Sequence, residues 1–280
     1  MISSDTGTLP GGHPYVSVGS GDRALVVMPG FGDAMFSGSY PPFSGWTLAP
    51  YFARYLDEYT VYVLSRPRGL PAGYDEDDAI ASHTAAFEAI AGSSNGVDVI
   101  GISMGGLIGQ ALARREPELV DRLVLANTAC RLDGDARSTV RRLERFARER
   151  DWASIRSELA VAMFSDGRAM AYPLTLQTAG RFVQPRPAVP ADVRRSLEFI
   201  LEFDGCDRLA AIDQPTLVFA GERDPYFTAD LARETADGLS NGELEIVSGA
   251  KHGAFHERKL TFDSRVRSFL ERTAPKALEA

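Results

Sequence analysis

Short apolar runs rich in β-branched residues alternate with longer helical patterns along most of this chain. We expect buried strands at 24–29, 60–64, 97–102, 122–126, 215–220 and 243–247. Candidate helices lie near 46–57, 77–91, 104–115, 228–239 and 255–271. Parallel neighbouring strands need a crossover connection, so this order predicts an α/β protein with a doubly wound, mostly parallel sheet and helices on both faces. Residues 12–20 add a candidate edge strand.

One stretch interrupts the alternation, from about residue 128 to 208. It contains arginine-rich amphipathic segments and a cluster of prolines, and no convincing buried strand. We interpret it as a helical cap inserted into a core formed by residues 1–127 and 209–280. Its apolar residues either line a substrate pocket or form a small core of their own: Phe146, Trp152, Met163, Phe164, Met170, Phe182, Phe199 and Phe203.

The composition is ordinary for a globular protein, with 38 acidic and 30 basic side chains and a net charge of -8. Such a charge disfavours nucleic acid and anionic membrane surfaces as partners. The N-terminus lacks the pattern of a secretion signal and no segment is long enough to span a bilayer, so a cytoplasmic location is the default expectation.

Two cysteines, Cys130 and Cys206, nearly bracket the expected insertion. If the strands at 122–126 and 215–220 are sheet neighbours, the two thiols lie close to each other. A disulfide also requires an oxidising compartment, which the cytoplasmic expectation does not supply. We therefore predict two free thiols. Their spacing is not that of a metal site, and we expect neither a metal nor a cofactor.

The strand at 97–102 runs into Gly101-Ile102-Ser103-Met104-Gly105 and then into a helix. This is the G-x-S-x-G pattern of a nucleophile elbow. Serine on such a strained strand-to-helix turn is held outward at a helix N-terminus, where negative charge is stabilised. A tight turn without catalytic meaning is the alternative, but the position between a strand and a helix favours Ser103 as a nucleophile.

A serine nucleophile requires a base and a group that orients that base. His252 follows the last expected strand, where open α/β sheets place their sites, and His256 is its only serious rival. Asp224 follows the strand at 215–220 and is the expected acid, with Glu222 and Asp33 as alternatives. The chain order serine, aspartate, histidine fits this assignment.

An oxyanion hole needs backbone donors that point at the developing charge. The first core strand ends in Met28-Pro29-Gly30-Phe31-Gly32, whose glycines permit a sharp turn. We therefore predict the N–H groups of Phe31 and of Met104 as the two donors.

With these elements in place, the sequence resembles the α/β-hydrolase superfamily along nearly the whole chain. The run from Gly101 to Gln110 is similar to the elbow of its enol-lactonases, esterases and cofactor-free haloperoxidases. These branches share their triad, so the elbow does not choose among them. Dehalogenases and epoxide hydrolases of the superfamily use an aspartate nucleophile, so Ser103 disfavours both of these activities.

The chain departs from that resemblance at two loops. Where most relatives have His-Gly, this chain has Pro29-Gly30, and the loop 65–70 reads Ser-Arg-Pro-Arg-Gly-Leu instead of Asp-x-Arg-Gly-x-Gly. Residues 35–46 form an aromatic-rich insertion that we expect to supply one wall of the pocket.

The combined reading predicts a serine hydrolase that cleaves a small carboxylic ester or lactone through an acyl-enzyme. Perhydrolysis or carbon–carbon cleavage in the same site is the enzymatic alternative. A small-molecule receptor with this fold is a less favoured one, because fold alone does not fix function. A small-molecule substrate is the expected partner, and a homo-oligomer is possible.

Overall fold

The computed structural model describes residues 3–36, 38–92, 96–165 and 186–272. Eight strands form one sheet with the order β1-β2-β4-β3-β5-β6-β7-β8. The six expected strands correspond, within two residues at each end, to β3 Arg23–Met28, β4 Tyr59–Leu64, β5 Val97–Ile102, β6 Val120–Ala126, β7 Thr216–Gly221 and β8 Gly242–Val247. These six are parallel to their neighbours among themselves. The predicted fold class, an α/β-hydrolase fold with a mostly parallel sheet, is therefore confirmed.

The antiparallel end of the sheet was only partly anticipated. The expected edge strand exists as β2 His13–Val18, but it is not the edge, because β1 Ser4–Leu9 pairs with its outer side. The β1 sequence, SDTGTL, is largely polar and alternates between half-buried and exposed positions. It therefore lacks the apolar run by which the other strands are recognised.

Helices cover both faces of the sheet, and alternate strand residues point to opposite layers. In β3, Val26 and Met28 join the larger core beneath α2 Glu76–Ala91, α3 Met104–Arg115 and α8 Ala229–Gly238. Leu25 and Val27 join the core on the other face, beneath α1 Ser44–Phe52 and α10 Lys259–Leu270. The helix expected at 255–271 is two helices, α9 Ala254–Glu257 and α10.

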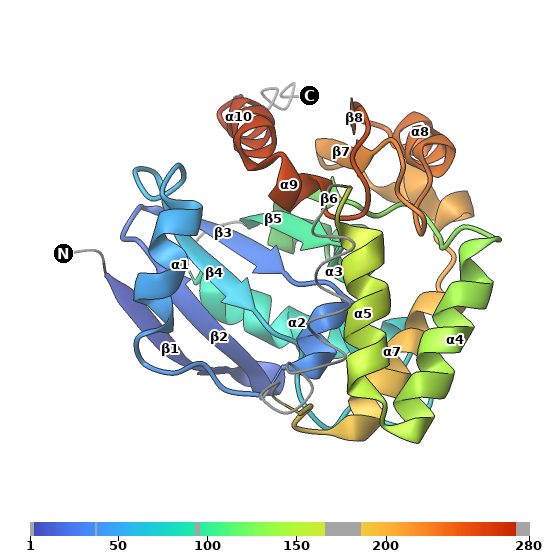
Figure 1. Cartoon of the computed structure of the whole chain (residues 1–280). Coiled ribbons are helices and arrows are strands. Elements are labelled where there is room, and N and C mark those ends of the chain that lie inside the picture. The colour runs from blue at the N-terminus through green and yellow to red at the C-terminus, as the bar shows by residue number, and fades with distance from the viewer. Residues whose placement is uncertain (1–2, 37, 93–95, 166–185, 273–280) are drawn as a thin grey trace.

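In its described residues, the segment between β6 and β7 contains the α-helices α4 Ala136–Glu149, α5 Trp152–Met163 and α7 Pro190–Glu202, which we call the cap helices. Figure 1 shows them side by side beyond the carboxyl ends of the central strands. Of the apolar residues listed for this segment, Met170 and Phe182 lie outside the described residues. Phe199 and Phe203 pack against each other in the core, whereas Met163 faces the cavity described below.

The prediction of two free thiols is wrong, because Cys130 and Cys206 form a disulfide with a Cα–Cα distance of 4.8 Å. Strands β6 and β7 are neighbours, so the two ends of the segment between them return to the same place. The backbone N–H of Gly205 also donates to the Cys130 carbonyl at 2.8 Å. The strand order predicts that the two cysteines lie close together. The prediction that they are free thiols depended on the expected compartment and not on their geometry. None of the helices in the described ranges is long and apolar enough to cross a membrane.

Candidate active site

Ser103 lies between the end of β5 and the start of α3, with φ 51° and ψ −118°. A positive φ is strained for a residue with a side chain, as expected for an elbow. The flanking glycines are required by close backbone packing. A Cβ atom on Gly101 would lie 2.6 Å from the Cα atom of Gly106, and one on Gly105 would collide with the Met28 carbonyl oxygen. The turn therefore holds the Ser103 side chain at the carboxyl edge of the sheet.

The structure brings the three residues expected to act together into one hydrogen-bonded chain. His252 Nε2 lies 3.0 Å from Ser103 Oγ, and His252 Nδ1 lies 2.8 Å from Asp224 Oδ2. All three residues are buried, with exposed fractions of 8% for Ser103, 6% for His252 and 4% for Asp224. Asp224 follows β7 and His252 follows β8, so three separate strand ends supply the arrangement.

The Asp224 carboxylate is held by more than the histidine. Its Oδ1 atom accepts hydrogen bonds from the backbone N–H groups of Tyr226, at 2.9 Å, and Phe227, at 3.1 Å. Its Oδ2 atom accepts a further bond from Asn127 Nδ2 at 3.2 Å. These donors fix the carboxylate in the plane that faces the His252 ring, which packs edge-on against the Tyr226 ring.

Asn127 is a site residue that the sequence reading missed. It directly follows β6 with a φ of 49°, and its side chain also donates to the Lys251 carbonyl and accepts from the Phe255 N–H. It thus ties the acid to the loop that carries His252. Asparagine tolerates positive φ better than most residues, and a buried asparagine directly after an apolar strand was the available signal.

The alternative acids and the alternative base lie elsewhere. His256 packs against the rings of Tyr51, Phe164 and Phe255. Glu222 is exposed and accepts hydrogen bonds from Ser248 Oγ and the Gly249 N–H. The hydrogen-bonded chain at Ser103 therefore contains His252 and Asp224, and not His256 or Glu222.

Asp33, the other alternative acid, forms an ion-pair network with Arg66 and Arg68. Burial alone would raise the pKa of the Asp33 carboxyl, but the two guanidinium groups hold it below its ordinary value. Arg66 also donates to the carbonyl oxygens of Pro29, at 2.9 Å, and Gly30, at 3.1 Å. The unusual 65–70 loop thereby fixes the strand end that leads to Phe31.

The two expected oxyanion donors begin helical turns. Phe31 is the first residue of the 3-10 helix Phe31–Met35, and Met104 is the first residue of α3. The N–H groups of a first turn have no partner within their own helix. Gly30 approaches the nucleophile so closely that a Cβ atom there would lie 3.2 Å from Ser103 Cβ. Phe31 lines the cavity, whereas the Met104 side chain is fully buried in the core.

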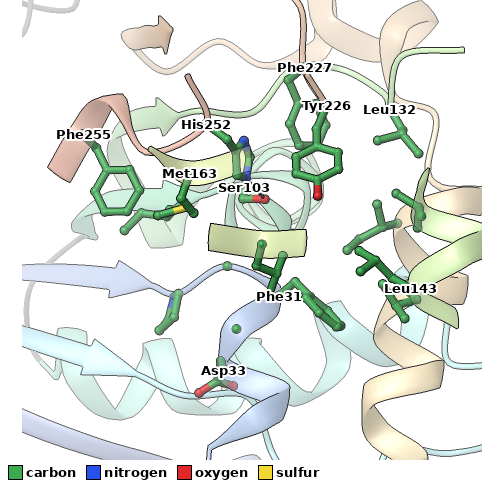
Figure 2. A pocket seen from close by; sticks show the side chains of 18 residues that line it. Phe31, Asp33, Ser103, Leu132, Leu143, Met163, Tyr226, Phe227, His252 and Phe255 are labelled. Atoms are coloured by element: carbon green, nitrogen blue, oxygen red, sulfur yellow. Dashed lines mark hydrogen bonds between the residues drawn. The ribbon is translucent and has the colours of Figure 1, made fainter. Parts of the chain in front are cut away.

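A cavity of about 400 Å³ opens at Ser103 and His252. Figure 2 shows Ser103, His252 and Tyr226 on one side of it and Leu143 on another. Among the described residues, the segment between β6 and β7 contributes apolar side chains to the cavity wall: Leu132, Val140, Leu143, Leu159, Met163, Leu197 and Ile200. None of the described residues of 35–46 lines the cavity, and Trp46 is 69% exposed, so the expected aromatic wall is wrong.

One group of potential metal ligands occurs in the described part of the chain, formed by Cys130, Cys206 and Glu234. Both sulfur atoms belong to the disulfide and are therefore not available as thiolate ligands. This group lies apart from the Ser103 cavity and is not among its lining residues.

Comparison with known proteins places this geometry in a family. The sequence profile of the alpha/beta hydrolase fold matches residues 23–259. The chain is 28% identical over 184 residues to 3-oxoadipate enol-lactonase 2 of Acinetobacter baylyi, covering 61% of this chain and 62% of that protein. The match thus spans less than two thirds of that curated relative.

Solved structures share the fold over nearly the whole chain. An esterase from Exiguobacterium antarcticum superimposes with a TM-score of 0.73 at 20% identity, covering 95% of this chain and 100% of the other. A meta-cleavage product hydrolase from Pseudomonas fluorescens superimposes with a TM-score of 0.69 at 16% identity, covering 96% and 97%. At such identities the likeness concerns the fold alone. From the profile match, this chain belongs to the alpha/beta hydrolase fold family.

Proposed function

We propose that the protein is a serine hydrolase that cleaves a small carboxylic ester or lactone through an acyl-enzyme. The observation that carries the proposal is the hydrogen-bonded chain from Ser103 Oγ through the His252 ring to Asp224 Oδ2, at 3.0 and 2.8 Å. The curated relative named as an enol-lactonase, at 28% identity, supports the reaction class.

The geometry is consistent with the following sequence of steps. His252 Nε2 accepts the Ser103 proton as Oγ attacks the carbonyl carbon, while Asp224 holds the imidazole in the tautomer protonated at Nδ1. The resulting oxyanion is placed near the N–H groups of Phe31 and Met104, each of which contributes about 2.7 to 4 kcal/mol in comparable sites.

When that intermediate breaks down, His252 passes the proton to the departing alkoxide oxygen, and Ser103 remains acylated. In a lactone, the new hydroxyl stays attached to the acyl chain. A water molecule then loses its proton to His252 and attacks the acyl-enzyme. Release of the carboxylic acid restores the Ser103 hydroxyl.

The test compares three alanine variants on p-nitrophenyl butanoate. Ser103→Ala and His252→Ala are each expected to lower kcat by about 10³- to 10⁶-fold, because each removes one member of a cooperative unit. His256→Ala is the matched control, a second histidine four residues onward, and should retain wild-type turnover. Circular dichroism checks that each variant is folded.

Covalent labelling supplies an independent readout. A fluorophosphonate should modify the wild-type protein once, at Ser103, and should leave Ser103→Ala unmodified. Turnover in Ser103→Ala within about tenfold of wild type, or labelling at another serine, would overturn the assignment.

A further inference from the structure

Tyr226 is placed in the cavity by the same loop that holds the acid. Its backbone N–H donates to Asp224 Oδ1, and its side chain is 6% exposed and lines the cavity. In Figure 2 the Tyr226 hydroxyl points into the cavity, away from the loop and on the side where Ser103 lies. The proposed reaction does not use this group.

The Tyr226 hydroxyl is buried and has no hydrogen-bond partner among the residues that the structure describes. The other polar side chains of the cavity wall are satisfied: Ser103 by His252, His252 by Asp224, and Asp33 by its arginines. Buried polar groups are almost always hydrogen-bonded, so an isolated hydroxyl in a cavity indicates a partner that arrives with the ligand.

The hydroxyl is a donor over the whole physiological pH range. Burial raises the pKa of the Tyr226 phenol, and the carboxylates of Glu158 and Asp224 raise it further. A protonated phenol at the wall of an apolar space offers one O–H to a ligand oxygen. A ketone, ether or hydroxyl oxygen can accept that bond.

The rest of the cavity argues against a charged ligand. No lysine or arginine is present among its described lining residues. Arg66 and Arg68, which contact the turn around Phe31, are already paired with Asp33. A carboxylate transferred into such a space would be desolvated without a counter-ion, which is strongly unfavourable.

We propose that the cavity selects an uncharged substrate whose chain is apolar except for one acceptor oxygen, besides the reacting carbonyl, that bonds to the Tyr226 hydroxyl. This inference rests on the proposed ester or lactone hydrolysis and narrows its substrate class. The proposed substrate differs in charge from that of the relative named 3-oxoadipate enol-lactonase 2, because 3-oxoadipate is a dicarboxylate.

The experiment uses three kinds of p-nitrophenyl ester of one chain length: hexanoate, hexanoates carrying a ketone at each inner carbon in turn, and the adipate monoester. We expect kcat/KM for the best keto ester to exceed that for hexanoate by about tenfold, the effect of one neutral hydrogen bond. The adipate ester should be at least about a hundredfold poorer than hexanoate.

Two tyrosine variants assign the preference to its residue. Tyr226→Phe should abolish the keto preference, because it should lower kcat/KM for the best keto ester about tenfold more than kcat/KM for hexanoate. Tyr74→Phe is the matched control, because the Tyr74 hydroxyl is also buried and unpaired within the described ranges, but Tyr74 does not line the cavity. It should keep the wild-type ratio.

The outcomes separate the two proposals. An equal loss on all esters in Tyr226→Phe would show that the hydroxyl serves the reacting carbonyl or His252, and would overturn the specificity role. No keto preference in the wild type, or efficient adipate cleavage, would overturn it as well. If no ester is hydrolysed, the proposed function fails, and calorimetry with Ser103→Ala and the methyl esters still measures whether binding prefers the ketone through Tyr226.

Discussion

The two sides of the cavity differ in what they contribute. Within the described part of the chain, the polar side chains of the wall come from loops at the carboxyl ends of the strands, and the cap helices supply apolar side chains. Side chains on loops that a rigid sheet fixes can hold the distances that proton transfer requires. We therefore expect the sheet side to supply the reacting groups and the Tyr226 hydroxyl, and the cap side to set the size and shape of the apolar substrate chain that fits.

Several contacts join the two sides, such as those of Asp192 in α7 with the Gly69 and Leu70 N–H groups, and the end of α5 contacts the loop that carries His252. The carbonyl oxygens of Ala162 and Met163 accept hydrogen bonds from the N–H groups of His252, at 3.2 Å, and Gly253, at 2.9 Å. Lys251 Nζ donates to the Val161 carbonyl in the same turn. The last turn of α5 is therefore bound directly to the loop that carries His252, so displacement of α5 would also disturb the base.

The largest effect should come from the buried acid on the sheet side. Asp224→Asn preserves the shape of the side chain but removes the charge that selects the correct His252 tautomer, and we expect kcat to fall by about 10⁴-fold. Steady-state hydrolysis of p-nitrophenyl butanoate measures it. Glu222→Gln is the control, since this exposed carboxylate two residues earlier accepts hydrogen bonds from Ser248 and Gly249 instead of holding His252. A loss in Glu222→Gln as large as in Asp224→Asn would contradict the assignment of the acid.

The sequence predicted the residues that directly follow apolar strands better than the contacts between distant loops. The elbow at Ser103 and the loops of Asp224 and His252 follow apolar strands, whose ends a parallel sheet must bring to one edge. Asn127 and Arg66 were missed because their roles depend on contacts with residues far along the chain. The failed aromatic wall at 35–46 has the same origin, since aromatic content does not tell which direction a loop takes.

The second prediction concerns the covalent link at the base of the cap. Replacing both Cys130 and Cys206 by alanine should lower the free energy of unfolding by about 4 kcal/mol, because the bridge closes a long loop in the unfolded chain. Urea unfolding of both proteins measures the difference. Thiol titration of the denatured wild-type protein without reductant should find no free groups, and a count of two would show that the bridge does not form.

The third prediction concerns His13, a buried histidine of β2 whose ring centroid lies 4.3 Å from that of His83. Burial lowers the pKa of His13 to about 4, although its bond to the Ser65 carbonyl opposes the shift. The unfolded state, with an ordinary pKa near 6.5, therefore binds a proton that the folded state does not. Neutral His13 therefore contributes to the free energy of unfolding fully above pH 6.5. This contribution, about 3 kcal/mol, is lost as the pH falls toward 4.

Unfolding free energies of wild type and His13→Gln, measured between pH 7.5 and 4.5, test this contribution. The variant should show a shallower loss of stability on acidification, whatever its stability at neutral pH. An identical pH slope in the two proteins would mean that His13 does not titrate with folding.

The smallest expected effect is on the cap side, and it tests the division between reaction and fit directly. Leu143 lies in α4, is buried, and faces the cavity, so Leu143→Ala enlarges the space for the substrate chain. We expect the ratio of kcat/KM for octanoate to that for acetate to rise about tenfold, because one or two methylene groups in an apolar pocket are worth about that factor. Turnover of the acetate, which does not reach the cap, should remain within about threefold of wild type.

Leu201→Ala is the matched control, a leucine of the cap helix α7 that is absent from the cavity wall. If the acetate rate falls as far as the octanoate rate in Leu143→Ala, the cap acts on the reaction itself, through the α5 contact with His252, and the division between the two sides is wrong.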